Sequence, residues 1–418
     1  MKQCNLLRYY ERENRMDFTK LFHDRTAFER EYLQQRMDMY GFKNMSRMEL
    51  FLWDLELFLQ IQKRLGKHIV LKGGAAAQFY LPIEAQRTSV DIDMIFCGTD
   101  EDVKSTLDDI TEYLKEDSEF FSFTEHIPLN PKTSLPMHTY FVDVPSVLTN
   151  KERNVANDTI DKQELKIEFI METEDWEYTR KTGENIFAVQ SEFEYQLLPV
   201  SHLLADKFTT IGCETIGVQN DRMDEQIKQF YDVMMLTTYQ LDALDIQETR
   251  KKYLHRAVKE WYDRKDNPYD LQEIIADVRK QLLRYSMADS GDDVELKKYI
   301  NDFKALYLNS KVEFNPQVVA CGTAKVRLMY EAMLNDDNWD AVRKALNIEK
   351  DLELNQYEGK EKGAKTKEIR EMLIREFQSY STIPANILKG KNLKRILWAI
   401  VDKDNLNEIQ DKVLELVD

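Results

Sequence analysis

A glycine turn followed by an acidic strand constrains the fold of this chain more than any other feature. Gly73 and Gly74 follow the apolar run 68–71, which predicts a short buried strand and a sharp turn. In the segment 89–94, Val, Ile and Met alternate with Ser and two Asp. Side chains alternate between the faces of a strand, so Asp91 and Asp93 are expected on one face. The order strand, glycine turn, helix, acidic strand indicates phosphoryl-transfer chemistry that uses a hard cation.

A third carboxylate is expected on a neighbouring strand. Nucleotidyl transfer generally uses two divalent ions, which two aspartates rarely hold alone. Glu168 is the first candidate, because it lies in the alternating segment 165–169 and points away from the three apolar residues there. Asp143, in the alternating run 140–144, is the competitor.

These residues resemble the motifs of the AbiEii/AbiGii toxin nucleotidyltransferases, bacterial members of the polymerase-beta-like superfamily found in type IV toxin–antitoxin pairs. The resemblance covers roughly residues 45 to 240, and the motifs are specific only when taken together. They are Gly73-Gly74, Arg87-x-Ser89-x-Asp91-Ile92-Asp93, Lys166-x-Glu168, a helix with Leu203-Leu204-Ala205-Asp206-Lys207, and Arg222 followed by Lys228-Gln229-Phe230-Tyr231-Asp232.

Two positions depart from the family pattern. Gln229 stands where the family usually has the first aspartate of its last motif, and only Asp232 keeps its acid. Gln229 can accept a hydrogen bond but cannot take a proton, so catalysis is expected to be slower or redirected. Ala75 stands where a threonine is common, which removes a hydroxyl that could touch phosphate.

The resemblance implies a complete set of site residues. Asp91, Asp93 and Glu168 would bind Mg²⁺ or Mn²⁺, and these three with Lys207 and Asp232 would form the catalytic set. Gly73, Gly74, Arg87, Ser89 and Lys207 would bind the nucleotide.

Each of these residues also has a purely structural interpretation. Arg87 could fork onto phosphate oxygens or hold the strand and loop in place. Ser89 could contact phosphate or cap a turn. Lys207 could be a solvated helix residue, and Asp232 could pair with Lys228 four residues earlier on the same helix.

The expected fold is an α/β (α+β) nucleotidyltransferase core with a mixed sheet, followed by a mainly α-helical second domain. At 418 residues the chain is too long for one ordinary core. We expect a catalytic domain at 1–195, with helices at 16–65 and strands from 68, and a helical domain at 196–418 that contributes Lys207 and Asp232 to the cleft. The ranges expected inside the first domain are a helix at 101–116 and loops at 130–136 and 150–161, and the helical breaks expected beyond residue 245 lie near 266–268, 289–293, 315–316 and 359–363.

Composition limits the cellular setting and the partners. The net charge of −17 argues against a surface that grips long nucleic acid. A local basic groove at 360–367, or at Lys389, Lys391, Lys394 and Arg395, stays possible, although solvated helix faces are the simpler interpretation. Four scattered cysteines suggest free thiols, and no apolar stretch predicts a signal peptide or a membrane span. We therefore expect a cytoplasmic protein with no membrane partner.

The function predicted from these features is a metal-dependent toxin nucleotidyltransferase. By resemblance, the donor is GTP or another nucleoside triphosphate, and the acceptor is RNA, in some members the 3′ end of tRNA, or a protein. A cognate antitoxin and a part in phage defence are implied in the same way. Three alternatives stay open: a small-molecule (antibiotic) nucleotidyltransferase, a non-catalytic nucleotide-binding regulator, and a purely structural interaction protein.

Overall fold

The chain folds into two compact units. The first contains residues 1–79, 86–131 and 136–198, and the second contains residues 80–85, 132–135 and 199–418. The computed structural model describes residues 20–115, 121–127, 137–148, 162–173, 176–335, 339–381, 383–384, 388, 390 and 392–417. The loops expected at 130–136 and 150–161 lie outside these described residues.

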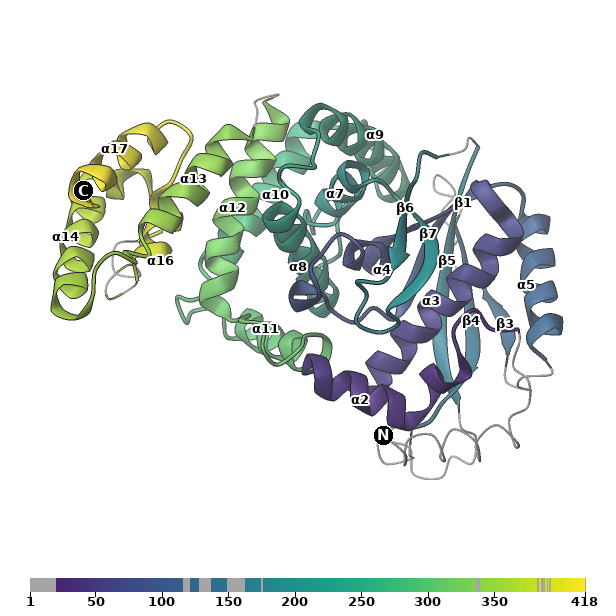
Figure 1. The fold of residues 1–418 in the computed structure, drawn as a ribbon. Coiled ribbons are helices and arrows are strands. Elements are labelled where there is room, and N and C mark those ends of the chain that lie inside the picture. The colour runs from purple at the N-terminus through teal and green to yellow at the C-terminus, as the bar shows by residue number, and fades with distance from the viewer. Residues whose placement is uncertain are drawn as a thin grey trace, which may run out of the picture. The chain divides into compact units, whose positions relative to one another are not determined.

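A seven-stranded sheet forms the centre of the first unit (Figure 1). Its strand order is β3-β4-β5-β2-β1-β7-β6. The β2/β5 and β1/β7 pairs are parallel and the other pairs are antiparallel, so the expected mixed sheet is confirmed. The strands are β1 (Ile69–Lys72), β2 (Asp91–Cys97), β3 (Ser122–His126), β4 (Met137–Pro145), β5 (Lys162–Glu172), β6 (Thr179–Gly183) and β7 (Ser191–Leu197).

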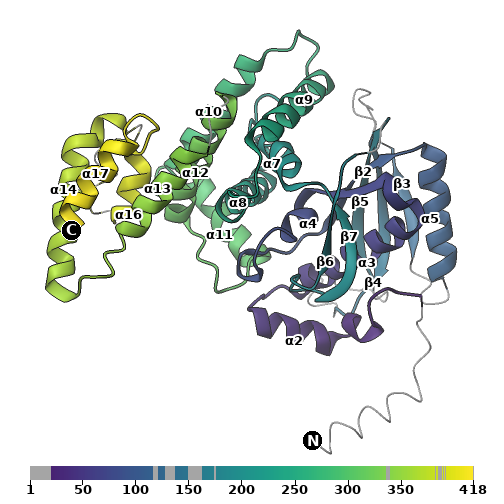
Figure 2. The ribbon, with the colours of Figure 1, turned by 45° about the horizontal axis from the view of Figure 1, so that its top comes forward.

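Helices cover this sheet because their apolar stripes need burial. α3 (Met45–Leu65) starts at Asn44, whose side chain accepts a hydrogen bond from the Arg47 amide, and it packs against β1, β2, β5 and β7. α5 (Asp100–Leu114) starts with a capping box between Thr99 and Asp102 and lies over β3, as Figure 2 shows. The remaining elements are η1 (Arg25–Phe28), α2 (Arg30–Tyr40), η2 (Gly66–His68) and α4 (Gly73–Gln78).

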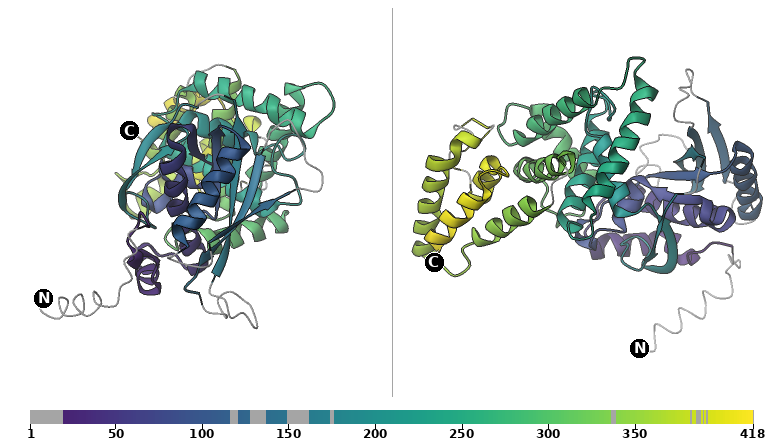
Figure 3. Two further views of the ribbon diagram at one scale, coloured as in Figure 1. Left: turned by 90° about the vertical axis from the view of Figure 1, so that its right-hand side faces the viewer. Right: turned by 90° about the horizontal axis from the view of Figure 1, so that it is seen from above.

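The second unit is helical, as expected. Its C-terminal helices, yellow-green to yellow in Figure 3, pack against one another through the α13/α17, α14/α16 and α14/α17 contacts. Its elements are η3 (Ile83–Ala85), α7 (Val200–Thr209), α8 (Met223–Tyr239), α9 (Ile246–Arg264), α10 (Leu271–Ser286), α11 (Val294–Tyr307), α12 (Pro316–Leu334), α13 (Asp340–Asp351), α14 (Gly359–Phe377), η4 (Gln378–Tyr380), α16 (Leu393–Ile400) and α17 (Leu406–Val417).

The expected helix breaks agree with these bounds except at one place. The breaks near 266–268, 289–293 and 315–316 each separate two helices, and Asn315 caps α12 with Pro316 in the first turn. Gly363 was expected to interrupt the chain, but it lies inside α14. A glycine costs an exposed helix only about 1 kcal/mol, which the flanking turns tolerate. Among the described helices, none has the length and apolar content needed to cross a bilayer.

One short segment of the N-terminal half belongs to the second unit. Residues 80–85 follow α4 in the chain, yet they pack with the helices beyond residue 199. The Tyr231 hydroxyl donates to the Ala85 carbonyl at 2.9 Å, and the Asn309 amide donates to the Glu84 carbonyl at 3.1 Å. The sequence analysis predicted a single boundary at 195/196 and did not predict that residues 80–85 belong to the second unit.

Candidate active site in the first unit

The register of three strands places the two aspartates beside the other motif residues. β2 runs antiparallel to β1 and parallel to β5, which fixes its position in the middle of the sheet. Asp93 lies opposite Lys72 on β1 and opposite Glu168 on β5. Asp91 lies opposite Lys166. Because directly opposed residues share a face of the sheet, Asp91, Asp93, Lys166 and Glu168 form one polar patch.

The glycine turn touches this patch. Gly73 has φ +71°, a left-handed conformation that side chains rarely adopt. A Cβ atom at Gly73 would overlap the carboxylate of Asp93. The turn therefore approaches Asp93 as closely as it does only because residue 73 lacks a side chain.

Gly74 has the same relationship to Arg87 and Ser89. A Cβ atom there would overlap the Arg87 guanidinium and lie 3.1 Å from the Ser89 hydroxyl oxygen. Arg87 is only 3% exposed, and its guanidinium donates to the Thr88 carbonyl at 2.9 Å. A buried arginine that donates to the backbone suits the structural role considered above, in which Arg87 holds the strand and the loop in place. The sequence-predicted residues Gly73, Gly74, Arg87, Ser89, Asp91, Asp93 and Glu168 are thus grouped in one unit.

The patch contains its own positive charge. The Lys166 ammonium pairs with Glu168 Oε1 at 2.8 Å. Burial alone would lower the pKa of Lys166, but Glu168, and after it Asp91 and Asp93, raise this pKa above its ordinary value. The negative potential of all three acids therefore acts at the Lys166 ammonium.

The described residues of this patch do not form a complete set of metal ligands. Within the described residues, no three His, Cys, Asp or Glu side chains form a group that holds a metal ion as they stand. Glu168 Oε1 is held by the Lys166 ammonium. The donor set, carboxylate oxygens beside a bare glycine turn, fits a hard divalent cation.

Asp143, the competitor for the third carboxylate, lies farther along the sheet. It is opposite Glu164 on β5, whereas Glu168 is opposite Thr139. Four residues along a strand correspond to about 13 Å. Asp143 also pairs with Lys162. The register thus brings Glu168, and not Asp143, next to Asp93.

The second unit holds the remaining predicted site residues, Lys207 and Asp232, in a buried cluster. Lys207 on α7 pairs with Asp232 on α8 at 2.9 Å, and the two side chains are 2% and 0% exposed. The Lys207 ammonium also donates to the Gln229 side-chain oxygen at 2.6 Å. Lys207 is therefore no solvated helix residue. Asp232 thus has a counter-charge on another helix, while Lys228 pairs with Glu225 on its own helix.

Several of the basic residues weighed as a possible groove are engaged in ion pairs. Arg395 on α16 is fully buried and pairs with Asp289 at 2.9 Å. Lys394 pairs with Glu349, and Lys367 pairs with Glu371 at 3.9 Å. Lys389 and Lys391 lie outside the described residues.

One residue near the patch escaped the sequence analysis. Asp54 lies on α3 and is 1% exposed. Desolvation, and then the charges of Asp91 and Asp93, raise its pKa well above the ordinary value. The available signal was the presence of carboxylates, Asp54 and Glu56, within the apolar stretch from Leu50 to Ile61.

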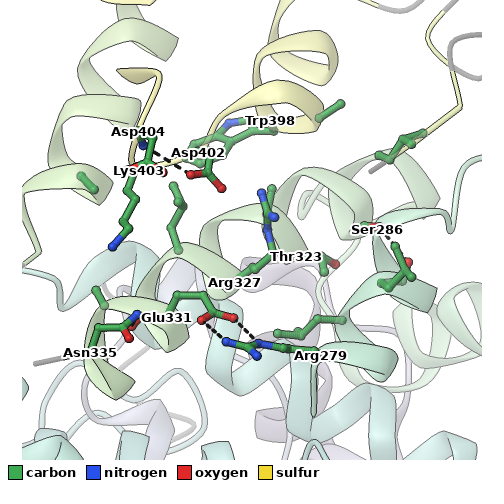
Figure 4. A pocket seen from close by; sticks show the side chains of 18 residues that line it. Arg279, Ser286, Thr323, Arg327, Glu331, Asn335, Trp398, Asp402, Lys403 and Asp404 are labelled. Carbon is green, nitrogen blue, oxygen red and sulfur yellow. Dashed lines mark hydrogen bonds and ion pairs between the residues drawn. The ribbon is translucent and has the colours of Figure 1, made fainter. Parts of the chain in front are cut away.

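A cavity of about 680 Å³ lies elsewhere, within the second unit (Figure 4). It is lined by residues of α10, α12 and α16 and by the segment 402–404. Arg279 and Glu331 at this cavity form a two-bond ion pair with distances of 2.7 and 2.6 Å. None of the residues predicted as site residues lines it, so its size alone gives it no role in the predicted chemistry.

The sequence of this chain matches a known protein family. Residues 57–316 match the model of the family described as "Nucleotidyl transferase AbiEii toxin, Type IV TA system". No curated protein sequence matches significantly. One similar solved structure is JHP933 from Helicobacter pylori, with 13% identity over 75% of this chain and 96% of that chain and a TM-score of 0.37. Another is MenT4, nucleotidyltransferase toxin Rv2826c from Mycobacterium tuberculosis H37Rv, with 10% identity over 92% and 98% and a TM-score of 0.40.

Proposed function

The chain belongs to the AbiEii family of type IV toxin–antitoxin nucleotidyl transferases, and from this membership we propose that it is a metal-dependent toxin that transfers a nucleotidyl group from a nucleoside triphosphate to an RNA or protein acceptor. The observation that carries this proposal is the position of Asp93. It lies opposite Glu168 on one side and against the bare turn at Gly73 on the other. A cation held there would face backbone amides that suit a triphosphate.

We assign the roles as follows. Asp91, Asp93 and Glu168 would hold Mg²⁺ or Mn²⁺, which would neutralise charge on the transferring phosphate. Gly73 and Gly74 would present backbone to the triphosphate, with Ser89 beside them. Arg87 would hold the turn against the strand. When the cation enters, Lys166 would leave Glu168 and become available to phosphate oxygens.

Lys207 and Asp232 enter this proposal through the family resemblance. The buried ion pair between them would fix the Lys207 ammonium in one position. Gln229 adds a neutral acceptor to that ammonium, where a carboxylate would add a second negative charge. We propose that the Lys207 ammonium binds the phosphate oxygens of the nucleotide and that Asp232 orients this ammonium.

The identity of the acceptor and of the donor is proposed from the family alone. By family resemblance we propose the 3′ end of tRNA as the first acceptor to test and GTP as the first donor. A cognate antitoxin, action in the cytoplasm and a part in phage defence follow from the same resemblance.

Label transfer tests the proposal directly. The purified chain is incubated with Mg²⁺, each α-labelled nucleoside triphosphate in turn, and either total tRNA, total protein or aminoglycosides. We expect label on tRNA or protein that disappears in the Asp91→Asn, Asp93→Asn double variant, whose circular dichroism spectrum should stay unchanged. Label on an aminoglycoside alone would instead favour the antibiotic-modifying alternative. Absence of label from every acceptor would refute the transferase proposal.

A second candidate function rests on Gln229. Because Gln229 cannot take a proton, a regulator that binds a nucleoside triphosphate without turnover is the alternative. It predicts saturable nucleotide binding with no release of pyrophosphate. A pyrophosphate assay run beside the label-transfer experiment separates the two functions.

A further inference from the structure

The carboxylate of Glu168 already binds a cation that belongs to the protein. The Lys166 ammonium lies 2.8 Å from Glu168 Oε1, and the Thr139 hydroxyl donates to the same oxygen at 3.4 Å. Lys166 and Glu168 are two residues apart on β5, so both side chains project from the face that carries Asp91 and Asp93. A metal ion that binds Asp93 and Glu168 therefore meets a positive charge that the protein itself holds there.

The Lys166 ammonium is charged and partly exposed to solvent. Burial would lower the pKa of Lys166, but Glu168, Asp91 and Asp93 raise it above its ordinary value, so the ammonium persists at neutral pH. The Lys166 side chain is 32% exposed, whereas Lys72, which lies opposite Asp93 on β1, is only 7% exposed. Of these two lysines, Lys166 is the one whose ammonium can leave its partner without crossing packed protein.

A second lysine on the same strand offers a comparison. Lys162 lies four residues before Lys166 and pairs with Asp143 on β4. The exposed fractions of its pair are 36% and 24%, against 32% and 19% for Lys166 and Glu168. Four residues of strand correspond to about 13 Å, so the Lys162 pair is well separated from the polar patch. The two pairs are alike in type and exposure and differ in whether they belong to that patch.

The ammonium and a divalent cation compete for one oxygen atom. A cation that takes Glu168 Oε1 leaves the Lys166 ammonium without its partner and beside a double positive charge, and both effects weaken the binding of the cation. A triphosphate removes this penalty, because its oxygens accept charge-assisted hydrogen bonds from an ammonium. Each ligand thus makes the binding of the other more favourable, and this coupling is equal in both directions.

We propose that Lys166 couples cation binding to nucleotide binding at this site: its ammonium holds Glu168 against a divalent cation that arrives alone, and moves to the phosphate oxygens when the cation arrives with a nucleoside triphosphate. The inference rests on the proposed function in taking Asp91, Asp93 and Glu168 as the cation ligands. It goes beyond that function in its consequence, which is that the site binds a free metal ion weakly and a metal–nucleotide complex tightly. Metal then occupies the site mainly when the substrate is present.

Two dissociation constants of the full-length protein test this coupling. Titration calorimetry measures the binding of Mn²⁺ without nucleotide, and then the binding of the α,β-methylene analogues of GTP, ATP, CTP and UTP at saturating Mn²⁺. These analogues do not undergo transfer, because a carbon atom replaces the oxygen of the bond that would break. For Lys166→Met we expect Mn²⁺ alone to bind about tenfold more tightly and the analogue about tenfold more weakly, a size usual for coupled ligands. A lysine with only a structural role does not move these two constants in opposite directions.

Lys162→Met is the matched control, since it removes a lysine of similar exposure from the same strand. Both constants should stay at their wild-type values in this variant. Lys166→Arg keeps a cation at position 166, so it should keep the binding of Mn²⁺ alone weak and restore analogue binding relative to Lys166→Met. The melting temperatures of all three variants without metal should lie close to that of the wild type, because ion pairs this exposed contribute little to stability.

Three results overturn the inference at Lys166 itself: binding of Mn²⁺ alone that is unchanged in Lys166→Met, binding of Mn²⁺ alone that is weakened there, or analogue affinity that this variant leaves unchanged. Equal tightening of Mn²⁺ binding in Lys162→Met overturns it as well, since any nearby lysine would then have the same effect. So does a wild-type protein that binds no Mn²⁺ or none of the analogues.

The inference and the proposed function fail in different ways. If both constants of Lys166→Met move as expected but the wild-type protein labels no acceptor, the coupling by Lys166 stands and the transferase proposal falls. If the wild-type protein labels an acceptor and Lys166→Met has wild-type constants, the transferase proposal stands and the coupling falls.

Discussion

Single residues decide how the polar patch is built. Gly73 allows the turn to reach Asp93, Gly74 allows it to receive Arg87, and Lys166 supplies the positive charge that Glu168 binds. In the second unit, Lys207 and Asp232 neutralise one another at almost complete burial. Each of these arrangements depends on atoms that a single substitution adds or removes.

Gly73→Ala should disable the carboxylate patch. The new methyl group would overlap Asp93, and the positive φ adds backbone strain on the order of 1–3 kcal/mol. Gly66→Ala is the control, because Gly66 also has a positive φ, of +60°, but its Cβ would meet no atom within 4 Å. We expect urea unfolding to show a loss of stability in both variants. Mn²⁺ binding should be lost only in Gly73→Ala, and retention of full affinity there would contradict the close approach of turn and strand.

Lys207→Met should destabilise the protein strongly, whatever the catalytic role of Lys207. It removes the Lys207 ammonium from the fully buried Asp232, and breaking such a buried pair typically costs about 3–5 kcal/mol. Adding Asp232→Asn removes the stranded charge and should restore a large part of that stability. Chemical denaturation of the two variants measures both effects. A double variant no more stable than Lys207→Met would show that the pair does not account for the loss.

At the scale of elements, the positions of strands and helices determine which charges meet. β2 is an inner strand between β1 and β5, so its acids lie on backbone that is hydrogen-bonded on both sides. Such strands hold their side chains more rigidly than loops do. In the second unit, α12 brings Lys325 close to Trp398 of α16, with the ammonium 5.6 Å from the ring centre, and within 3.2 Å of the Thr238 hydroxyl on α8.

Lys325 should make the stability of the second unit depend on pH in the alkaline range. Burial lowers the pKa of Lys325, while Glu349 raises it and Lys394 lowers it further. The folded protein thus binds this proton less tightly than the unfolded chain does, so stability rises as the pH climbs from the folded pKa towards the unfolded value of about 10.4. Lys325→Met should raise the melting temperature at pH 7, and this gain should shrink as the pH approaches 10.

The exposed Lys360 on α14 provides the control for that measurement. Lys360→Met removes a lysine that has not lost its water, so its effect on the melting temperature should be small and independent of pH over the same range. A gain from Lys325→Met that stays constant up to pH 10 would show that lost packing or hydrogen bonding, and not the buried charge, sets the difference.

The whole molecule consists of two units, and one short segment between two parts of the first unit belongs to the second. Residues 80–85 leave the first unit after α4, pack in the second, and return the chain to the strand that carries the aspartates. Tyr80, Leu81 and Ala85 are buried in that packing. The chain of the first unit is therefore interrupted by a segment that accepts hydrogen bonds from residues beyond 199.

A fragment of residues 1–198 should not reproduce the stability of the first unit. Its segment 80–85 would lose the hydrogen bonds from Tyr231 and Asn309 and expose its apolar side chains to water. We expect low soluble yield, and an unfolding midpoint in urea below that of the full chain monitored by the same near-ultraviolet signal. A fragment with the midpoint of the full chain and unchanged Mn²⁺ affinity would show that the segment contributes nothing to the first unit.

The sequence by itself determined the local parts of this protein. The alternation at 91–94, the glycine turn, the mixed sheet, the helical second half and most helix breaks were predicted correctly, because backbone geometry imposes periods of 2 and 3.6 residues wherever a face is buried. At 89–90 the predicted alternation does not hold, because the strand begins at Asp91. The motif order was enough to indicate the family. Gly363 inside α14 shows the limit of a turn signal when neighbouring residues favour a helix.

Only the tertiary structure decided which distant residues meet. It paired β5 with β2, so that Glu168 and not Asp143 lies opposite Asp93. It also paired Asp232 with Lys207 of another helix. It also placed Asp54 near the aspartates and residues 80–85 among later helices. The physical reason is that pairing across long sequence separations depends on strand register and on the burial of whole faces, which no local pattern encodes.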